Sequence, residues 1–184
     1  WTLSMEVFDR GLKRRQRERA FSRPDSAEFD YLRDEVAARL VDRLDDITMK
    51  FPRALDLGCN AGHVYRQLHA TASADLEGTV PGGVESLVQC DWTPAALRRA
   101  EAEAPTGFGV ETEYLCADMQ DDELPFAPES FDLVLSSLSM HWVNDIPRVF
   151  SKVRRLLKPD GAFVCALLGG DTLEELRHCM YLAE

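Results

Sequence analysis

The sequence predicts an α/β protein built on a parallel sheet with helices on both faces. Short, almost continuously apolar segments alternate with longer ones in which apolar residues recur at helical spacing, and this alternation is typical of successive β-α-β units. Strands buried on both faces of a parallel sheet have such apolar runs. The stretch ALDLGCNAG at residues 54–62 indicates a strand, a tight turn and a helix start, because two glycines bracket three residues directly after an apolar run.

Two segments precede the sheet. Residues 8–21 are charged with few apolar side chains, so we expect a helix-permissive arm that lies on a surface. Residues 1–20 carry six Lys and Arg residues against three Asp and Glu residues, which predicts a basic arm over residues 1–24 before a main domain at residues 25–184. A solvated helix face is the simpler interpretation of this charge, and docking on an acidic partner or on the protein's own body is the alternative.

The other elements follow from periodicity and from turn residues. We expect strands at residues 54–57, 86–90, 113–116, 131–136 and 162–168, and helices at residues 31–44, 61–70, 93–104, 144–157 and from 171 or 172 onward. Glycines and prolines within residues 71–84 indicate a loop insertion, and KPDG at residues 158–161 is expected to stop the preceding helix. Asn144 or Asp145 caps that helix, which has Pro147 in its first turn.

Composition narrows the classes of function. The 184 residues suffice for one domain with a proper core. A net charge of -11 argues against a nucleic-acid binder that works by neutralising phosphates. No run approaches the ~20 apolar residues of a membrane span. The 5 cysteines form no C-x-x-C pair, which indicates a reducing compartment without a structural disulfide or zinc site.

The glycine turn and two later acids predict a nucleoside site. With Gly58 as the first glycine of a G-x-G-x-x-G motif, Asn60 and His63 occupy the other two glycine positions, so a dinucleotide pyrophosphate site is poorly supported. Asp91 follows Gly62 by 29 residues, longer than the usual ~20 because of the insertion. A carboxylate there can accept hydrogen bonds from two ribose hydroxyls, and Asp118 after the next strand could reach the exocyclic amine of an adenine.

Each acid also has a structural interpretation. Asp56 could orient the turn, Asp91 could cap the following helix, and Asp118 could be a solvated loop residue. Each of these interpretations is plausible for one residue alone. Three acids at successive strand ends around one glycine turn favour the nucleoside site.

An ordered series of motifs completes this pattern. It comprises DLGCNAG at residues 56–62, VQCDW at 88–92, LCADMQDDELPF at 115–126, FDLVLSSLSMHWVND at 131–145 and LKPDG at 157–161. The series resembles class I S-adenosylmethionine-dependent methyltransferases over residues ~50 to 170. The resemblance implies a Rossmann-like, three-layer α/β/α fold that lacks its C-terminal strands in this chain.

Further segments resemble one branch of that superfamily. They are FDRGLKRRQ at residues 8–16, FDYLRDEV at 29–36, FPRALDLGC at 51–59, SSLSMHWVNDIPR at 136–148 and LGGDTLEELR at 168–177. They are similar to the mitochondrial complex I assembly factor 5 family, of arginine hydroxylase type, which is related to the malonyl-carrier-protein methyltransferases of biotin synthesis. The first, second and last of these segments lie outside the shared methyltransferase motifs.

The resemblance implies a role for each site residue. It places the methionine end of S-adenosylmethionine near Asp56, Gly58, Asn60 and Gly62, the ribose at Asp91 with Trp92 beside it, the adenine near Asp118 and Met119, and the methyl-bearing side near Ser136 through His141. The superfamily usually has glycine where this chain has Asn60. Asparagine tolerates a positive φ better than most residues, so the turn can survive.

His141 is the only candidate for chemistry beyond cofactor binding. It follows the fourth strand and could act as a base or orient a substrate, although a hydrogen-bonded histidine in the wall, with Trp142 packing beside it, is slightly favoured. His63, His69 and His178 have no spacing that predicts a metal site.

The resemblance implies a function in the mitochondrial matrix, with association with the inner membrane as an extension; a bacterial-like relative would be cytoplasmic. The expected role is assembly of respiratory complex I by methylation or arginine hydroxylation of an iron-sulfur subunit. One alternative is a methyltransferase acting on the carboxyl group of a malonyl or acyl carrier protein or of a small molecule. Another is a non-catalytic assembly or scaffold protein. The resemblance also allows peripheral contact with a membrane, whereas nucleic acid is not an expected partner.

Overall fold

The computed structural model describes residues 6–121 and 123–183. Within them, parallel strands form one 5-stranded sheet in the order β3-β2-β1-β4-β5. The strands are β1 (Arg53–Leu57), β2 (Ser86–Asp91), β3 (Glu111–Cys116), β4 (Phe131–Ser137) and β5 (Leu157–Ala166). The predicted parallel α/β fold is confirmed. The strand order reverses between β1 and β4, and open α/β sheets bind ligands beyond the carboxyl ends of their strands at such a point.

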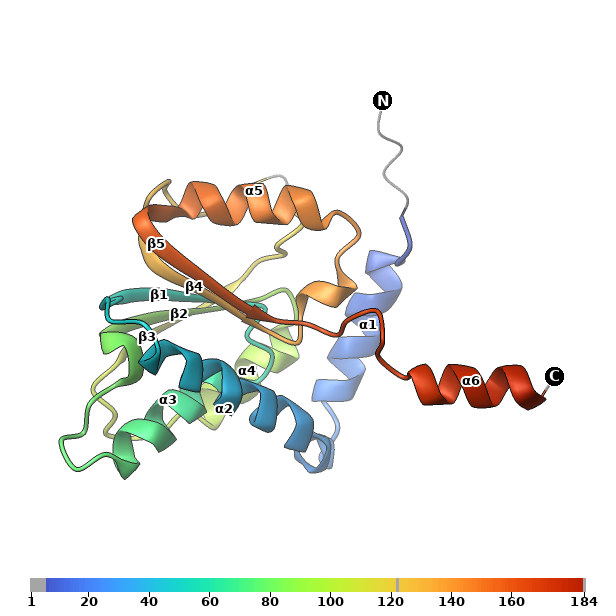
Figure 1. The fold of residues 1–184 in the computed structure, drawn as a ribbon, viewed down its shortest axis with the longest axis horizontal. Coiled ribbons are helices and arrows are strands. Elements are labelled where there is room, and N and C mark those ends of the chain that lie inside the picture. The colour runs from blue at the N-terminus through green and yellow to red at the C-terminus, as the bar shows by residue number, and fades with distance from the viewer. Residues whose placement is uncertain (1–5, 122, 184) are drawn as a thin grey trace.

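Helices cover both faces of the sheet. They are α1 (Arg10–Phe21), α2 (Tyr31–Asp45), α3 (His63–Ala74), α4 (Pro94–Ala102), α5 (Ile146–Leu156) and α6 (Glu174–Ala183). Figure 1 shows α2, α3 and α4 on one side of the sheet and α5 on the other. Successive strand residues alternate between the faces, because Ala54 packs in the cluster with α2 and α3, whereas Leu55 packs in the cluster with α5.

The first helix lies across the edge to which the strands point (Figure 1). Asp9 caps α1, its side chain accepting a hydrogen bond from the Leu12 amide at 2.8 Å. Phe21 at the other end is buried together with Ala61, Ala95 and the neighbouring Ala96. The arm therefore docks on the protein's own body at the carboxyl ends of the sheet.

The last strand begins earlier than expected. β5 starts at Leu157 instead of residue 162, because KPDG lies inside the strand as an irregularity. Leu157 pairs with Phe131 and Ala162 pairs with Leu133, with a shift in register between these two pairs. Asp160 has a φ of 63° there. KPDG thus follows the end of α5 as expected, but the strand runs through it and ends at Ala166.

Two other boundaries differ from the sequence predictions. α3 continues to Ala74, so the insertion is shorter than residues 71–84 and ends in a 3-10 turn at Pro81–Gly83. Pro81 is buried and Gly82 lies against the α2 side chain of Leu44, which ties this loop to the core. At the start of α2, Tyr31 and Leu32 are 77% and 48% exposed, although both belong to the predicted apolar repeat.

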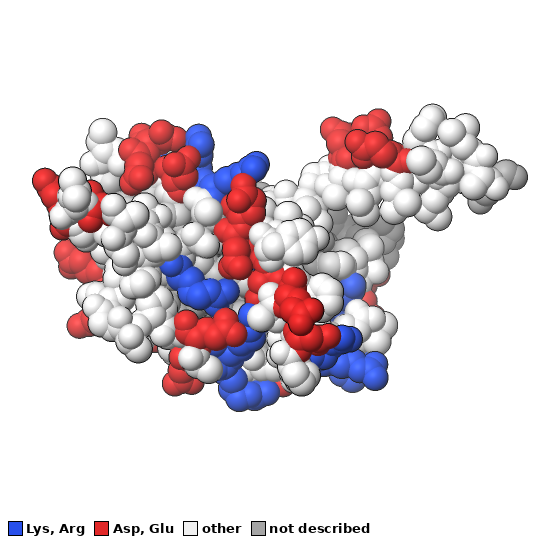
Figure 2. Space-filling view, turned by 90° about the horizontal axis from the view of Figure 1, so that it is seen from below, with Lys and Arg blue, Asp and Glu red and all other residues white. Residues whose placement is uncertain are grey.

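Charged side chains are mixed on the face that α2, α3 and α4 cover. Figure 2 shows acidic and basic groups interspersed there. Ion pairs join Arg66 to Asp34 and Glu103, and Arg99 to Asp30 and Glu103. These pairs connect the helices to one another.

The C-terminal helix projects away from the sheet after β5 (Figure 1). Its apolar side chains Leu176, Met180, Tyr181 and Leu182 are exposed. Within the described part of the chain, no helix combines the length and the apolar composition that crossing a membrane requires.

Candidate cofactor site

The turn between β1 and α3 requires left-handed backbone at three positions. Gly58, Asn60 and Gly62 have φ angles of 82°, 54° and 76°. A Cβ atom on Gly58 would lie 2.1 Å from Ser139 Oγ and 2.9 Å from Met119 Cε, and one on Gly62 would lie 2.9 Å from a glutamine oxygen of β2. Both glycines are therefore required by conformation and by space.

Asn60 holds the middle of this turn by four hydrogen bonds. Its Nδ2 donates to the carbonyl oxygens of Gly58 and Ser137, both at 3.1 Å. Its backbone amide donates to Asp91 Oδ2 at 3.1 Å, and its Oδ1 accepts from Arg17 Nη2 at 3.0 Å. The expectation that asparagine supports the turn in place of glycine is confirmed, since a buried side chain here satisfies two backbone carbonyls that glycine would leave open.

Asp91 is buried where the ends of β1 and β2 meet. Its Oδ1 accepts from the Thr93 amide at 2.8 Å, which fixes the start of α4, and its Oδ2 accepts from the Asn60 amide. Arg17 Nη2 donates to both carboxylate oxygens, at 3.2 and 2.9 Å. The structural interpretation of Asp91 as the cap of α4 is wrong, because Thr93 is the N-cap residue and α4 has no side-chain cap. The Asp91 carboxylate instead binds the amide of that residue, at the carboxyl edge of the sheet.

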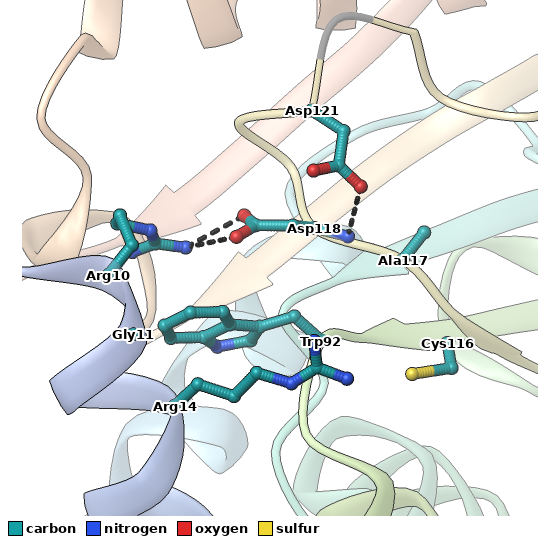
Figure 3. A pocket seen from close by; sticks show the side chains of 8 residues that line it. All are labelled: Arg10, Gly11, Arg14, Trp92, Cys116, Ala117, Asp118 and Asp121. Atoms are coloured by element: carbon teal, nitrogen blue, oxygen red, sulfur yellow. Dashed lines mark hydrogen bonds and ion pairs between the residues drawn. The ribbon is translucent and has the colours of Figure 1, made fainter.

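Asp118 and Trp92 lie together on a cleft of about 270 Å³. The residues that line it are Arg10, Gly11, Arg14, Trp92, Cys116, Ala117, Asp118 and Asp121. Figure 3 shows the Arg10 side chain over one face of the Trp92 ring, with its end at the Asp118 carboxylate. Arg10 Nη2 lies 2.7 and 2.6 Å from the two oxygens of Asp118, and the guanidinium carbon lies 3.7 Å from the Trp92 ring centroid.

Asp56 is fully buried near the end of β1, and its pKa is raised above the ordinary value of an aspartate. Neither of its carboxyl oxygens has a hydrogen-bond partner within the described residues. Burial raises the pKa of Asp56 to about 8, and the negative charge of Asp91 contributes to the rise. At neutral pH this carboxyl is mostly protonated, and a cationic group of a ligand beside it would favour its ionised form.

Ser136 and His141 occupy the β4 side of the site. The Ser136 hydroxyl is buried and donates to the Leu57 carbonyl oxygen at 2.7 Å, so it joins β4 to β1. His141 lies half-buried on a 3-10 turn at Met140–Trp142, and its Nδ1 has no hydrogen-bond partner within the described residues. Burial, with a smaller contribution from the positive charge of Arg17, lowers the pKa of His141. The imidazole is therefore neutral at pH 7.

Two other histidines lie on α3 and contact residues outside the predicted site. His63, directly after the turn, is buried and its Nδ1 lies 2.7 Å from Asp34 Oδ1, and His69 in the middle of the helix lies beside Ser73. Across residues 6–121 and 123–183, no group of three or more His, Cys, Asp and Glu side chains is placed to hold a metal ion.

The sequence reasoning missed the arginines that face the acids. Arg10 and Arg17 contact Asp118 and Asp91, and Lys13 between them lies over the Trp142 ring at 3.7 Å. Arg10 and Arg17 are seven positions apart with Lys13 between them, so the three residues share one helix face. The interpretation of α1 as a solvated helix is wrong for this face. It holds for the opposite face, where Arg15 and Arg19 are exposed.

Comparisons with known proteins agree with this architecture. A family model described as "Methyltransferase domain" matches residues 55–165. The "Arginine-hydroxylase NDUFAF5, mitochondrial" of Danio rerio is 42% identical over 181 residues, which are 98% of this chain and 50% of that protein. The "Malonyl-[acyl-carrier protein] O-methyltransferase" of Methylovorus sp. (strain MP688) is 31% identical over 180 residues, 96% of this chain and 56% of that protein. The chain thus spans about half the length of the curated relatives it matches.

A solved structure shows the same fold. It is a chain of the complex between the Haloferax volcanii Trm112 methyltransferase activator and its methyltransferase, with a TM-score of 0.65 and 20% identity over 87% of this chain and 66% of that chain. The family model covers more than half of the sequence, from β1 to the end of β5. The chain therefore belongs to the methyltransferase domain family, with the fold of the S-adenosylmethionine-dependent enzymes.

Proposed function

We propose that S-adenosylmethionine binds at the carboxyl edge of β1, β2 and β3. Asp91 accepts hydrogen bonds from the ribose hydroxyls, Trp92 stacks on the adenine, and Asp118 accepts from its exocyclic amine. The left-handed turn from Gly58 to Gly62 lies against the methionine end. The observation that carries this assignment is that acids lie at the carboxyl ends of three neighbouring strands of a methyltransferase domain, one of them, Asp91, bonded to the glycine turn.

The unpartnered carboxyl of Asp56 tests whether these residues fit the cofactor. Its two oxygens are buried without a hydrogen-bond partner in the described chain, and its pKa is raised to about 8. The ammonium group at the methionine end supplies the donors and the positive charge that this carboxyl lacks. The buried acid therefore fits a cationic amino-acid ligand better than a neutral one.

The bound cofactor supplies an electrophilic methyl group on a sulfonium. The protein holds the ribose through Asp91, whose carboxylate is oriented by the backbone amides of Asn60 and Thr93. The burial of Met119 and Trp92 excludes water. His141 remains the candidate base, because its imidazole is neutral at pH 7 and its Nδ1 is free to accept a proton.

Calorimetry on the full-length protein tests the cofactor. We expect Asp91→Ala to weaken the binding of S-adenosylmethionine at least about tenfold, because hydrogen bonds to a charged group are lost. Asp45→Ala on the exposed end of α2 is the matched control and is expected to bind like the wild type. Undetectable binding by the wild type and by all variants at millimolar ligand would contradict the assignment, whereas unchanged binding by Asp91→Ala would contradict the role of that residue alone.

For the substrate, the proposal is a protein of respiratory complex I assembly, an iron-sulfur subunit, modified in the mitochondrial matrix. Support comes from the 42% identity to a mitochondrial protein named an arginine hydroxylase and from the resemblance of the FDRGLKRRQ and LGGDTLEELR segments to the assembly factor family. The first of these segments contains the face of α1 that contacts the site.

The substrate is tested by mass spectrometry. The full-length protein, with S-adenosylmethionine, under air and with an added two-electron reductant, is incubated with the complex I iron-sulfur subunit and, separately, with a malonyl-loaded acyl carrier protein. A mass gain of one methyl group or one oxygen on the subunit identifies the reaction, and Asp91→Ala is the negative control. Carbonate extraction of mitochondria then distinguishes a matrix protein from one held on the inner membrane.

A carboxyl methyltransferase is the second candidate. The observation that favours it is the 31% identity to a malonyl-carrier-protein O-methyltransferase over 96% of this chain. Methylation of the carrier protein without change in the iron-sulfur subunit would establish it. Cofactor binding without turnover on either substrate would instead favour an assembly protein that retains the fold.

A further inference from the structure

The basic face of α1 occupies the cofactor edge, and both ends of the helix are anchored. Phe8 just before α1 packs edge-on against Trp142, with ring centroids 5.4 Å apart. At the other end Phe21 is buried, and Glu18 Oε2 accepts from the Ala95 amide at 3.0 Å, at the start of α4. The residues between these anchors are thereby held over the carboxyl ends of the strands (Figure 1).

Arg17 takes up the ribose position. Its Nη2 donates to both oxygens of Asp91 and to Asn60 Oδ1, and its Nε donates to Thr93 Oγ1 at 3.1 Å. The side chain of Asp91 is 0% exposed and that of Arg17 is 14% exposed. With two backbone amides also bound, little acceptor capacity of Asp91 remains for two ribose hydroxyls.

Arg10 takes up the adenine position in the same way. Its planar guanidinium lies 3.7 Å from the centre of the Trp92 ring and donates to both oxygens of Asp118 (Figure 3). A purine that stacked on Trp92 and donated its amine to Asp118 would require the same ring face and the same acceptor. The two arginines thus meet the two acids to which the proposed function assigns the nucleoside.

The cleft that α1 leaves open beside Trp92 is smaller than a typical small-molecule site. The cleft beside Trp92 has a volume of about 270 Å³, below the roughly 300 to 1,000 Å³ of small-molecule sites. A second cleft of about 360 Å³ lies between α1 and the start of α5. Arg10, Asp118 and Asp121 line both clefts. Release of the Arg10–Asp118 pair would therefore join them.

We infer that α1 is an autoinhibitory strap, whose Arg17 and Arg10 occupy the hydrogen-bonding positions of ribose and adenine and must leave them when the cofactor binds. The inference rests on the proposed function. The arginines pair with the two acids, and cofactor binding exchanges each arginine for a neutral donor of the ligand. Cofactor occupancy thereby sets whether this basic face is docked or free.

Calorimetry with S-adenosylhomocysteine, which lacks the sulfonium charge, tests the strap on the full-length protein. Arg17→Met removes the competing donor and leaves Asp91 buried and unpaired, so we expect at least about tenfold tighter binding, because loss of one partner of a buried pair is strongly unfavourable until another donor replaces it. Arg10→Met is expected to act in the same direction. Arg15→Met, on the exposed face of the same helix, is the matched control and should bind like the wild type.

Hydrogen exchange on the wild-type protein gives a readout that needs no substitution. Addition of S-adenosylhomocysteine should increase exchange of the α1 amides if the strap is released. Unchanged or weaker binding by Arg17→Met, with α1 amides that become more protected, would overturn the inference and would make the arginine a ligand of the cofactor. Binding by neither the wild type nor the arginine variants would remove the proposed function and the strap together, whereas binding only by the variants would support both.

Discussion

The buried carboxyl of Asp56 predicts a stability that falls as pH rises. In the folded protein the pKa of Asp56 is about 8, whereas its ordinary value is 3.8. Between these values the folded chain keeps a proton that the unfolded chain has released, so the unfolded state gains relative stability with each step up in pH. Asp56→Asn removes the titration while it conserves the shape of the side chain.

The size of the effect follows from the shift. One pKa unit corresponds to about 1.4 kcal/mol. The titration of Asp56 therefore lowers the free energy of unfolding of the wild type by about 3 to 4 kcal/mol between pH 5 and pH 8. This figure is an upper limit, because water entry and relaxation reduce it. Titrating groups that do not interact with Asp56 are common to the two proteins, so their contributions cancel when the variant is compared with the wild type.

Urea unfolding of both proteins at pH 5 and at pH 8 measures this difference. The free energy of unfolding of Asp56→Asn should exceed that of the wild type by more at pH 8 than at pH 5, by up to the amount above. Asp45→Asn on the exposed end of α2 should show no such dependence on pH. An equal effect of Asp56→Asn at the two pH values would refute the reasoning, because it would mean that Asp56 is ionised and solvated throughout.

Three further predictions concern the turn and the strap. Asn60→Gly should lower the free energy of unfolding by about 1 to 3 kcal/mol in urea titrations, because two buried carbonyls lose their donor; no loss would contradict the role of its amide. Arg17→Met should raise the pKa of His141, measured by NMR titration, since the charge of Arg17 contributes to its lowering; a fall would contradict it. Phe21→Ala should lower the free energy of unfolding by about 3 kcal/mol and speed hydrogen exchange in α1. Unchanged exchange would show that Phe21 does not anchor the helix.

Local rules predicted most of the fold from the sequence. The central strands β1, β2 and β4 were predictable because both faces of the sheet are covered there, so nearly all of their residues are buried. The cap of α5 was predictable because Asp145 accepts from the Arg148 amide, a contact within four residues. The start of β5 was not, because KPDG predicts a turn by its own composition and only pairing with β4 carries the strand through it.

The candidate site was predictable for the acids and not for their partners. Asp56, Asp91 and Asp118 follow apolar runs, and parallel topology brings the ends of such runs to one edge. The docking of Arg10 and Arg17 depends on contacts 108 and 74 residues away along the chain. A charge excess with a shared helix face was the only signal, and such a pattern is equally typical of a solvated helix.

The outer edge of β5 has a consequence for handling the protein. Among the described strands β5 pairs only with β4, so its other edge presents backbone donors and acceptors over a segment rich in apolar residues, GAFVCALL at residues 161–168. Edges of this kind pair with strands of other molecules and promote aggregation. Lys158 and Asp160 at the beginning of the strand carry charge that discourages such pairing, and the apolar end beyond them has none. Concentrated samples of this 184-residue chain should therefore associate through β5 before any other part of the sheet.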